Sequence, residues 1–313
     1  MKGPAFDTVI QFFRKTLRTL PDVRTGTNTS YTIEDIALSA FSVFFTQSPS
    51  FLAFQKSMQQ NKGKNNAHSL FGVMSIPSDN QIKNVLDPIT PDFLFPVFSY
   101  IFNSLSDLGY LDTYRSYNGN LLLALDGVQY FSSKSIHCEN CSQKQHRNGT
   151  TTYYHTVITP VVAAPGNNAV ISLQPEFITP QDGHQKQDCE NAAAKRWLSK
   201  HSCEYSQFRF TILGDDLYCK QPLCKLMLQK GFDFILVCKP DSHKTLYEWI
   251  EGLNSSDIDT FSVKRWTGKR HEIDTYRFVN ELPLKDADDA LFVNWCEITT
   301  TLSDEKIIYK NAF

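Results

Sequence analysis

The pattern of apolar positions changes from helical to strand-like about one third of the way along the chain. In the segment 8–20 apolar residues recur at helical spacing. Thr32, followed three residues later by Asp35 and then by an apolar run, is typical of an N-cap with an acidic first turn. The pattern therefore predicts an α-helical N-terminal region over residues 1–117, with a role in DNA binding or dimerisation.

After Asn120 the pattern predicts alternating strands and helices. The expected elements, in order, are strands 121–125, 151–162 and 169–173, a helix 188–200, a strand 208–213, a helix 222–229 and a strand 232–237. A three-strand meander followed by helix–strand–helix–strand is the order of a ribonuclease-H-like core, with parallel strands added by right-handed crossovers. We therefore expect an α/β fold with a mixed sheet flanked by helices over residues 118–253, and a β-rich insertion over 254–313.

Composition narrows the class of protein. The 313 residues are 41% hydrophobic and 20% charged, which is a globular composition. No apolar run reaches the length of a membrane span, and the N-terminus lacks the features of a signal peptide, so a cytoplasmic protein without a membrane partner is expected. The net charge of −2 argues weakly against a nucleic-acid binder, because binding depends on where the charges lie.

Two acids stand directly after predicted buried strands. Asp126 follows the strand 121–125, and Asp215 follows the strand 208–213 and one glycine. Either alone is equally well explained as a turn residue. Together, at the ends of strands in one sheet, they predict a site for Mg²⁺ or Mn²⁺, which prefer carboxylate oxygens. Asp216 is the alternative to Asp215.

The segments around these acids resemble a known family. Leu123–Gly127 resembles the first-Asp motif of DDE transposases of bacterial insertion sequences, which have a ribonuclease-H-like catalytic domain. Leu213–Tyr218 resembles their second-Asp motif, in which an Asp lies three residues before a Tyr and heads a helix. Four further segments are similar to the branch of that family with a β-rich insertion: 77–82, 147–155, 181–190 (Gln181–Gly183 and Gln187–Glu190) and 234–240.

The resemblance implies metal-dependent DNA strand cleavage and strand transfer. It implies DNA as the partner, both element ends and target, and a homodimer for the full-length protein. It also implies a third acid, a Glu on a late helix in a Tyr–Arg–Glu–Lys-like signature, and no such segment occurs before Phe313. The chain is therefore expected to be C-terminally truncated and inactive; Glu297 and Glu305 lie in strand-like sequence and are not expected to replace the missing acid. The alternatives are a non-catalytic DNA-binding remnant of a transposase and a ribonuclease-H-like nuclease that acts without transposition.

The eight cysteines do not form a disulfide framework in a chain of this length. Cys138 and Cys141, with His137, His146 and His155 nearby, either bind Zn²⁺ or belong to an ordinary loop, because a lone Cys-x-x-Cys supplies only two ligands. The other six are expected to be isolated thiols: Cys189, Cys203, Cys219, Cys224, Cys238 and Cys296.

Each of the remaining charged candidate residues has two possible roles. Asp188 and Glu190 are expected to cap and charge a helix start rather than to bind metal. Four basic residues are candidates for contacts with DNA phosphate, the alternative being an ordinary solvated surface: Lys239, Arg265, Lys269 and Arg270.

Overall fold

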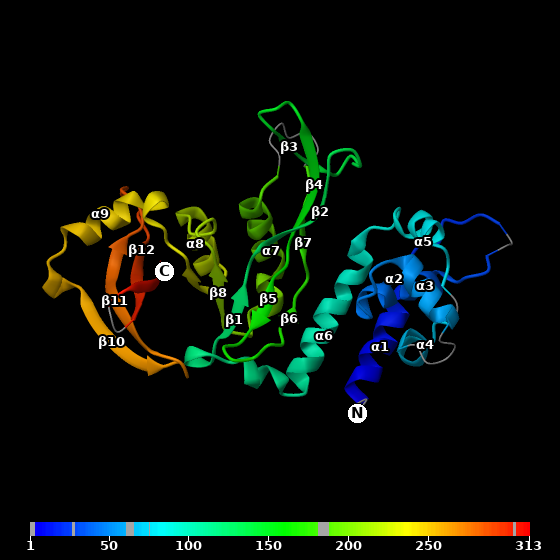
Figure 1. Cartoon of the computed structure of the whole chain (residues 1–313), viewed down its shortest axis with the longest axis horizontal. Coiled ribbons are helices and arrows are strands. Elements are labelled where there is room, and N and C mark those ends of the chain that lie inside the picture. Colours follow the sequence, from blue (N-terminus) through cyan, green and yellow to red (C-terminus); the bar gives the residue numbers. More distant parts are fainter. Residues whose placement is uncertain (1–3, 27–28, 61–65, 75, 181–187, 303–304) are drawn as a thin grey trace. The chain divides into compact units, whose positions relative to one another are not determined.

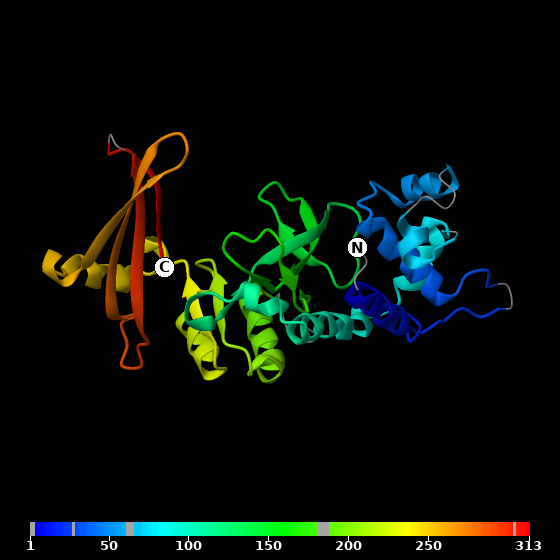
Figure 2. The same cartoon turned by 90° about the horizontal axis from the view of Figure 1, so that it is seen from below.

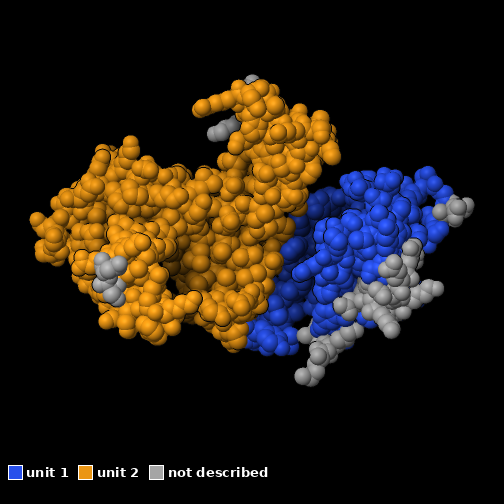
Figure 3. Space-filling model, in the orientation of Figure 1, with its two compact units in different colours: residues 1–110 blue, residues 111–313 orange. Residues whose placement is uncertain are grey.

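The computed structural model describes residues 4–26, 29–60, 66–74, 76–180, 188–302 and 305–313. The chain divides into two compact units, residues 1–110 and 111–313 (Figure 3). The finer division into three regions at 117 and 253 stays a prediction. The motif segment Gln181–Gly183 and its continuation to Gln187 lie outside the described residues.

The first unit is helical, as its apolar spacing predicts (Figure 1). Its elements are α1 (Pro4–Leu17), α2 (Ile33–Phe45), α3 (Phe51–Gln60), α4 (Asn66–Phe71), α5 (Asp79–Leu86), the 3₁₀ helix η1 (Pro91–Leu94) and α6 (Phe95–Asp107). Leu17, Ile36 and Phe54 lie in its buried apolar core. The predicted N-cap is confirmed, because the Thr32 hydroxyl accepts a hydrogen bond from Asp35 N at 3.0 Å and the Asp35 carboxylate accepts one from Thr32 N at 3.1 Å.

The second unit is built on a mixed five-stranded sheet in the order β6-β5-β1-β8-β9. Two short 3₁₀ helices, η2 (Tyr110–Tyr114) and η3 (Tyr117–Gly119), lead into it. The strands are β1 (Leu121–Ala124), β5 (Val161–Ala163), β6 (Ile171–Ser172), β8 (Phe210–Gly214) and β9 (Asp233–Leu236). The meander β1, β5 and β6 is antiparallel, whereas β8 pairs in parallel with β1 and β9 in parallel with β8. The chain thus has a mixed α/β fold.

The crossover helices α7 (Glu190–Tyr205) and α8 (Gln221–Gln229) lie side by side on one face of this sheet (Figure 2). Trp197 is fully buried on α7, and its indole N–H donates to Gln174 O at 2.8 Å, so the largest side chain of the helix also satisfies its only polar atom. Gly231, just after the end of α8, has the positive φ of 81° typical of the glycine that follows a helix.

The expected strand 151–162 is wrong as a single element. It divides at Thr159–Pro160 into β4 (Thr151–Ile158) and β5, which belong to different sheets. Pro160 has no N–H to donate to a ladder, and Thr159 N donates to Asp126 O at 3.2 Å instead. The sheet that holds β4 also contains strands that the apolar pattern did not reveal: β2 (Gly127–Ser133), β3 (Ser142–Gln145) and β7 (Glu176–Ile178).

The remainder of the second unit is helix α9 (Lys244–Gly252) and an antiparallel sheet in the order β10-β11-β12-β13 (Figure 1). The elements are the 3₁₀ helices η4 (Pro240–Ser242) and η5 (Ser255–Asp257), then β10 (Asp259–Trp266), β11 (His271–Pro283), β12 (Phe292–Leu302) and β13 (Ile307–Ala312). The strand-rich character expected after residue 254 is therefore present. In the described part of the chain no single helix has the length and apolarity to cross a membrane, although α5 together with Pro91–Asp107, bent by 95° at their junction, meets those criteria as a pair.

Candidate active site

Asp126 and Asp215 stand at the ends of two adjacent strands. Ala124 of β1 pairs with Leu213 of β8, and each aspartate follows its paired residue by two positions. Leu125 N donates to Leu213 O at 2.9 Å, so the alignment continues past the end of β1. Neighbouring strands lie about 4.8 Å apart, and these two run in the same direction, so both acids emerge at one edge of the sheet. Both side chains are exposed there.

Asp215 begins a tight turn. Its Oδ1 accepts from Leu217 N at 2.9 Å, and Tyr218 N donates to Asp215 O at 3.1 Å. The expectation that Asp215 heads a helix is wrong, because α8 begins only at Gln221, with Pro222 in its first turn.

Glu190 is a third carboxylate at the same place. Its carboxyl group lies directly against the backbone of Gly127, so that a Cβ at residue 127 would collide with it. The Tyr218 hydroxyl donates to Glu190 Oε2 at 3.2 Å. Burial raises the pKa of Glu190, the hydrogen bond from Tyr218 opposes that effect, and the charges of Asp126 and Asp215 raise the pKa further. The three carboxylates therefore share one electrostatic environment.

Two contacts join the start of α7 to the turn that carries Asp215. Besides the bond from Tyr218, Asn191 Nδ2 donates to Leu217 O at 3.2 Å. Tyr218 is fully buried, and burial followed by the charge of Glu190 raises the pKa of its phenol well above the usual value. Tyr218 is thus a neutral hydrogen-bond donor that positions Glu190.

Of the role expected for Asp188 and Glu190, to cap and charge a helix start, only the charge of Glu190 in the first turn is confirmed. The N-cap of α7 is Cys189, which makes no side-chain capping bond. Asp188 forms a two-pronged pair with Arg196, at 3.0 Å to Nη1 and 2.8 Å to Nη2, and its side chain is only 2% exposed. Asp188 is therefore committed to Arg196. Glu190 supplies the acidic first turn but directs its carboxylate to the strand ends.

The two late glutamates lie in other surroundings. Glu297, on β12, is paired with Arg277 at 3.2 Å and with Lys310 at 2.9 Å. Glu305 follows the end of β12 with a positive φ of 63°. Glu297 is neutralised within its own sheet, so of the four acids weighed only Glu190 shares the environment of Asp126 and Asp215.

The donor set suits hard cations. Carboxylate oxygens are the ligands that Mg²⁺ and Mn²⁺ prefer. Among the described residues, the groups that bring one ligand atom each to within 4.8 Å of one another contain cysteine and histidine, and the three carboxylates are not such a group. The three carboxylates would be the ligands for such a cation, which would supply activation of an attacking oxygen.

Cys138 and Cys141 lie together with His155 of β4. The two sulfurs are 3.8 Å apart, and His155 Nε2 is 3.4 Å from Cys138 Sγ and 3.3 Å from Cys141 Sγ. Burial lowers the pKa of His155, which favours the neutral ring that binds metals. Of the other nearby histidines, His146 is bonded to Thr152 Oγ1 at 2.7 Å and His137 stacks on a tyrosine ring.

A second cysteine–histidine group was missed in the sequence. Cys219, Cys238 and His243 each bring a ligand atom to within 4.8 Å of the others, and all three are buried. The expectation that Cys219 and Cys238 are isolated thiols is therefore wrong. The signal that could have revealed the group is the repeated spacing of five residues, Cys219 to Cys224 and Cys238 to His243.

The candidate DNA-contact residues are partly engaged within the chain. Arg265 pairs with Asp274 at 2.6 Å and with Glu272 at 2.8 Å, and Arg270 pairs with Glu272 at 3.0 Å. Lys239 and Lys269 are exposed. On the β10–β11 hairpin the positive charge is thus largely balanced by neighbouring acids.

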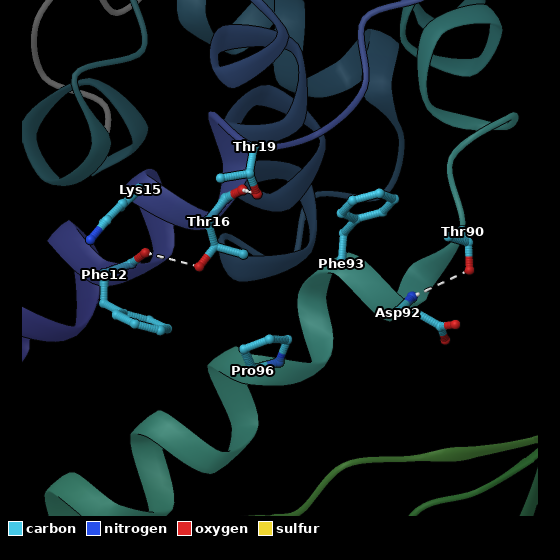
Figure 4. A pocket seen from close by; sticks show the side chains of 8 residues that line it. All are labelled: Phe12, Lys15, Thr16, Thr19, Thr90, Asp92, Phe93 and Pro96. Atoms are coloured by element: carbon cyan, nitrogen blue, oxygen red, sulfur yellow. Dashed lines mark hydrogen bonds between the residues drawn. The ribbon is translucent and has the colours of Figure 1, made fainter.

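The helical unit contains a hollow of about 500 Å³ between α1, η1 and α6 (Figure 4). Thr16 and Thr19 in its wall donate to Phe12 O and Thr16 O of their own helix. Lys15 and Asp92 are its only charged lining residues among those described. A smaller hollow of about 210 Å³ borders Asp188, Glu190 and Leu217, and neither Asp126 nor Asp215 lines it.

Comparison with known proteins found a distant structural resemblance and no sequence match. No family model matches the chain, and no curated protein matches it. One solved structure with a resemblance is the cryo-EM structure of a piggyBac transposase synaptic complex with hairpin DNA, at 13% sequence identity and a TM-score of 0.38 over 93% of this chain. The chain spans 59% of the length of that protein. A likeness this distant does not establish a shared activity.

Proposed function

We propose that the chain is a ribonuclease-H-like phosphoryl-transfer enzyme of the DDE transposase type, which cleaves DNA strands with Mg²⁺ or Mn²⁺ held by Asp126, Asp215 and Glu190. The observation that carries the proposal is the parallel pairing of β1 and β8, which aligns Asp126 with Asp215, together with the carboxyl group of Glu190 against Gly127.

The order of the central sheet supports the fold named in the proposal. A meander of three antiparallel strands is followed by two strands parallel to the first, with α7 and α8 as crossovers. This is the order expected of a ribonuclease-H-like core. The motif-like segments Leu123–Gly127 and Leu213–Tyr218 lie at the ends of β1 and β8, where such a core presents its acids.

The three carboxylates differ in exposure, and each proposed role follows from that difference. Asp126 and Asp215 are exposed at the sheet edge, where a long substrate such as a DNA strand can approach. Glu190 is half-buried and held by Tyr218, so it is positioned in advance. Bound cations supply activation of the attacking oxygen and stabilisation of the leaving oxygen. Strand transfer into a target, recognition of element ends and action as a homodimer belong to the same proposal through the sequence resemblance.

We also propose that Cys138, Cys141 and His155 bind Zn²⁺ and stabilise the sheet of β2, β3, β4 and β7. Two thiols and an imidazole within 4.8 Å are suitable zinc ligands. His155 supplies the third donor that the lone Cys-x-x-Cys lacked.

Metal binding and strand cleavage test the main proposal. Titration calorimetry with Mn²⁺ should show affinity that falls in Asp126→Asn, Asp215→Asn and Glu190→Gln, by at least the roughly 10-fold that losing even an outer-shell partner of a metal ligand costs. The exposed Glu248→Gln on α9 is the matched control and should bind as the unmodified chain does. Nicking of supercoiled DNA in Mg²⁺ or Mn²⁺ should disappear in the same three variants.

Two outcomes would contradict the proposal in different ways. Unchanged Mn²⁺ affinity in all three carboxamide variants would rule out the carboxylate site. Mn²⁺ binding and DNA binding without nicking would favour the alternative, a non-catalytic DNA-binding remnant. Nicking that survives Glu190→Gln but not Asp126→Asn would remove Glu190 alone from the site.

A further inference from the structure

Two cysteines and a histidine lie close together in the second unit, near the ends of β8 and β9 and the start of α9, and a third cysteine interacts with one of them. Cys219 follows the turn that contains Asp215, Cys238 follows β9, and His243 precedes α9. Their ligand atoms lie within 4.8 Å of one another, and the residues are 5%, 3% and 6% exposed, respectively. Sequence-distant segments thus place two thiols and an imidazole in one buried position.

Cys224 of α8 adds a third thiol. It is fully buried and interacts with Cys219, five residues earlier in the chain. Cys219 is therefore close to two other buried thiols, those of Cys224 and Cys238.

The carboxylate of Asp216 lies close to the His243 ring. Its Nε2 lies 3.3 Å from Asp216 Oδ1. The Asp216 carboxylate is itself held by Lys239 N at 2.8 Å and by Ser242 Oγ at 2.6 Å. A fixed carboxylate beside a histidine orients the ring and strengthens it as a metal ligand.

We propose that Cys219, Cys224, Cys238 and His243 form a structural zinc site. Three thiolates and one imidazole are a typical tetrahedral donor set for Zn²⁺, and soft sulfur ligands select Zn²⁺ over the Mg²⁺ preferred by the nearby carboxylates. Cys219, Cys238 and His243 are already grouped, and Cys224, which interacts with Cys219, is the fourth ligand of the proposal. All four residues are buried, and Cys219 and Cys238 also border a hollow of about 880 Å³; four protein ligands would leave no open position on the ion, which is typical of a structural site.

The site has a consequence for the carboxylates, and this part rests on the proposed function. Zn²⁺ would tie the residues after β8 to the end of β9 and the start of α9. Asp215 lies four residues before Cys219 in that tied segment, and Asp216 contacts His243. Removal of zinc should therefore loosen the turn that holds Asp215 and weaken Mn²⁺ binding, whereas loss of Mn²⁺ ligands should leave the zinc in place.

The test is the zinc content of the full chain, purified without chelators and measured by elemental mass spectrometry. Cys219→Ser, Cys238→Ser and His243→Ala should each contain one zinc fewer per chain than the unmodified protein. The exposed Cys203→Ser is the matched control and should lose none. Cys138→Ser reports the separate cluster at His155, and a double variant with Cys219→Ser should lose the sum of the two.

If the serine variants do not fold, a variant in which one zinc-binding residue replaces another still tests the proposal. His243→Cys should retain the zinc, and Co²⁺ loaded into the unmodified chain should give the visible bands of a tetrahedral thiolate site. Asp126→Asn should lose Mn²⁺ affinity but keep full zinc, which separates this proposal from the carboxylate site. Zinc content unchanged in all three variants, or an unmodified chain that contains no zinc and forms a Cys219–Cys238 disulfide on mild oxidation, would overturn the proposal.

Discussion

The hydrogen bond from Tyr218 to Glu190 affects how cation binding at the proposed site depends on pH. The pKa of Glu190 is raised in the folded chain, so the protonated form is favoured by folding. Without cations, the stability that this group contributes is fully present below the pKa of an unfolded glutamate and is lost as the pH rises through the folded value. Cations need the carboxylate, so their binding should tighten over that same interval and release a proton.

We predict that Tyr218→Phe moves the pH dependence of Mn²⁺ binding to higher pH. The hydrogen bond from Tyr218 lowers the pKa of Glu190, and its loss lets burial and the two aspartates raise that pKa further. The cost in unfolding free energy should be about 1 kcal/mol. Calorimetric titrations across the acidic range measure the shift. Tyr205→Phe, at the opposite end of α7, is the control; an identical shift there would contradict the role given to Tyr218.

Gly127 is required by the closeness of Glu190, not by its backbone angles. We predict that Gly127→Ala displaces the Glu190 carboxylate, because the new Cβ would collide with it, while the strand keeps its fold. Mn²⁺ affinity should fall about 10-fold or more, and the unfolding free energy should change by less than about 1.5 kcal/mol. Gly252→Ala meets no atom within 4 Å and serves as the control. Equal Mn²⁺ affinity in the two variants would show that Glu190 is not a ligand.

At the scale of elements, α7 is anchored by ion pairs from residues in its middle, Arg196 and Lys200. Arg196 bonds Asp188 and, through Nε at 2.7 Å, Glu176 of β7. Lys200 adds a contact to Glu176 at 2.9 Å. The hydrogen bond with Asp188 raises the pKa of Arg196, with a contribution from Glu176. This clamp holds α7 against β7 and so sets the position of Glu190.

We predict that Arg196→Ala destabilises the chain by about 3 kcal/mol, because it leaves the buried carboxylates of Asp188 and Glu176 without their main partner. Lys285→Ala removes only an exposed pair with Asp289 and should cost less than about 1 kcal/mol. Urea unfolding followed by circular dichroism measures both. Equal losses in the two variants would mean that the clamp does not stabilise α7.

At the scale of the whole molecule, each compact unit has the means to fold by itself. The helical unit buries its own core, and its basic residues Arg14 and Arg18 are both paired with Glu34 at 2.6 Å. The second unit contains the sheets, the three carboxylates and both cysteine–histidine groups.

We predict that residues 111–313, expressed alone, fold cooperatively and bind Mn²⁺ and Zn²⁺ with the stoichiometry of the full chain, because every proposed ligand lies in that unit. Residues 1–110 alone should be helical and bind neither. Circular dichroism and metal analysis of the two fragments provide the measurement. A fragment 111–313 that unfolds or loses its metals would show that the helical unit completes the second one.

Several elements follow from local sequence alone. The N-cap at Thr32, helix α1 with its helical apolar spacing, and the strands β1, β8 and β9 each depend on neighbouring residues, and each was predicted. The strands β2, β3 and β7 were not predicted. They are short or largely polar, so their side chains do not show the apolar pattern of a strand. They form because each pairs with β4 through backbone hydrogen bonds.

The sequence by itself identified two acids after two buried strands, because a strand end is a local pattern. It could not determine that Glu190 of α7 lies beside them, since this depends on how the Arg196 clamp and the Tyr218 bond orient a helix more than sixty residues from Asp126. From the sequence alone, Cys219 and Cys238 were likewise predicted to be isolated thiols. Only the parallel pairing of β8 with β9 brings them together, because hydrogen bonds between strands join residues that are distant along the chain.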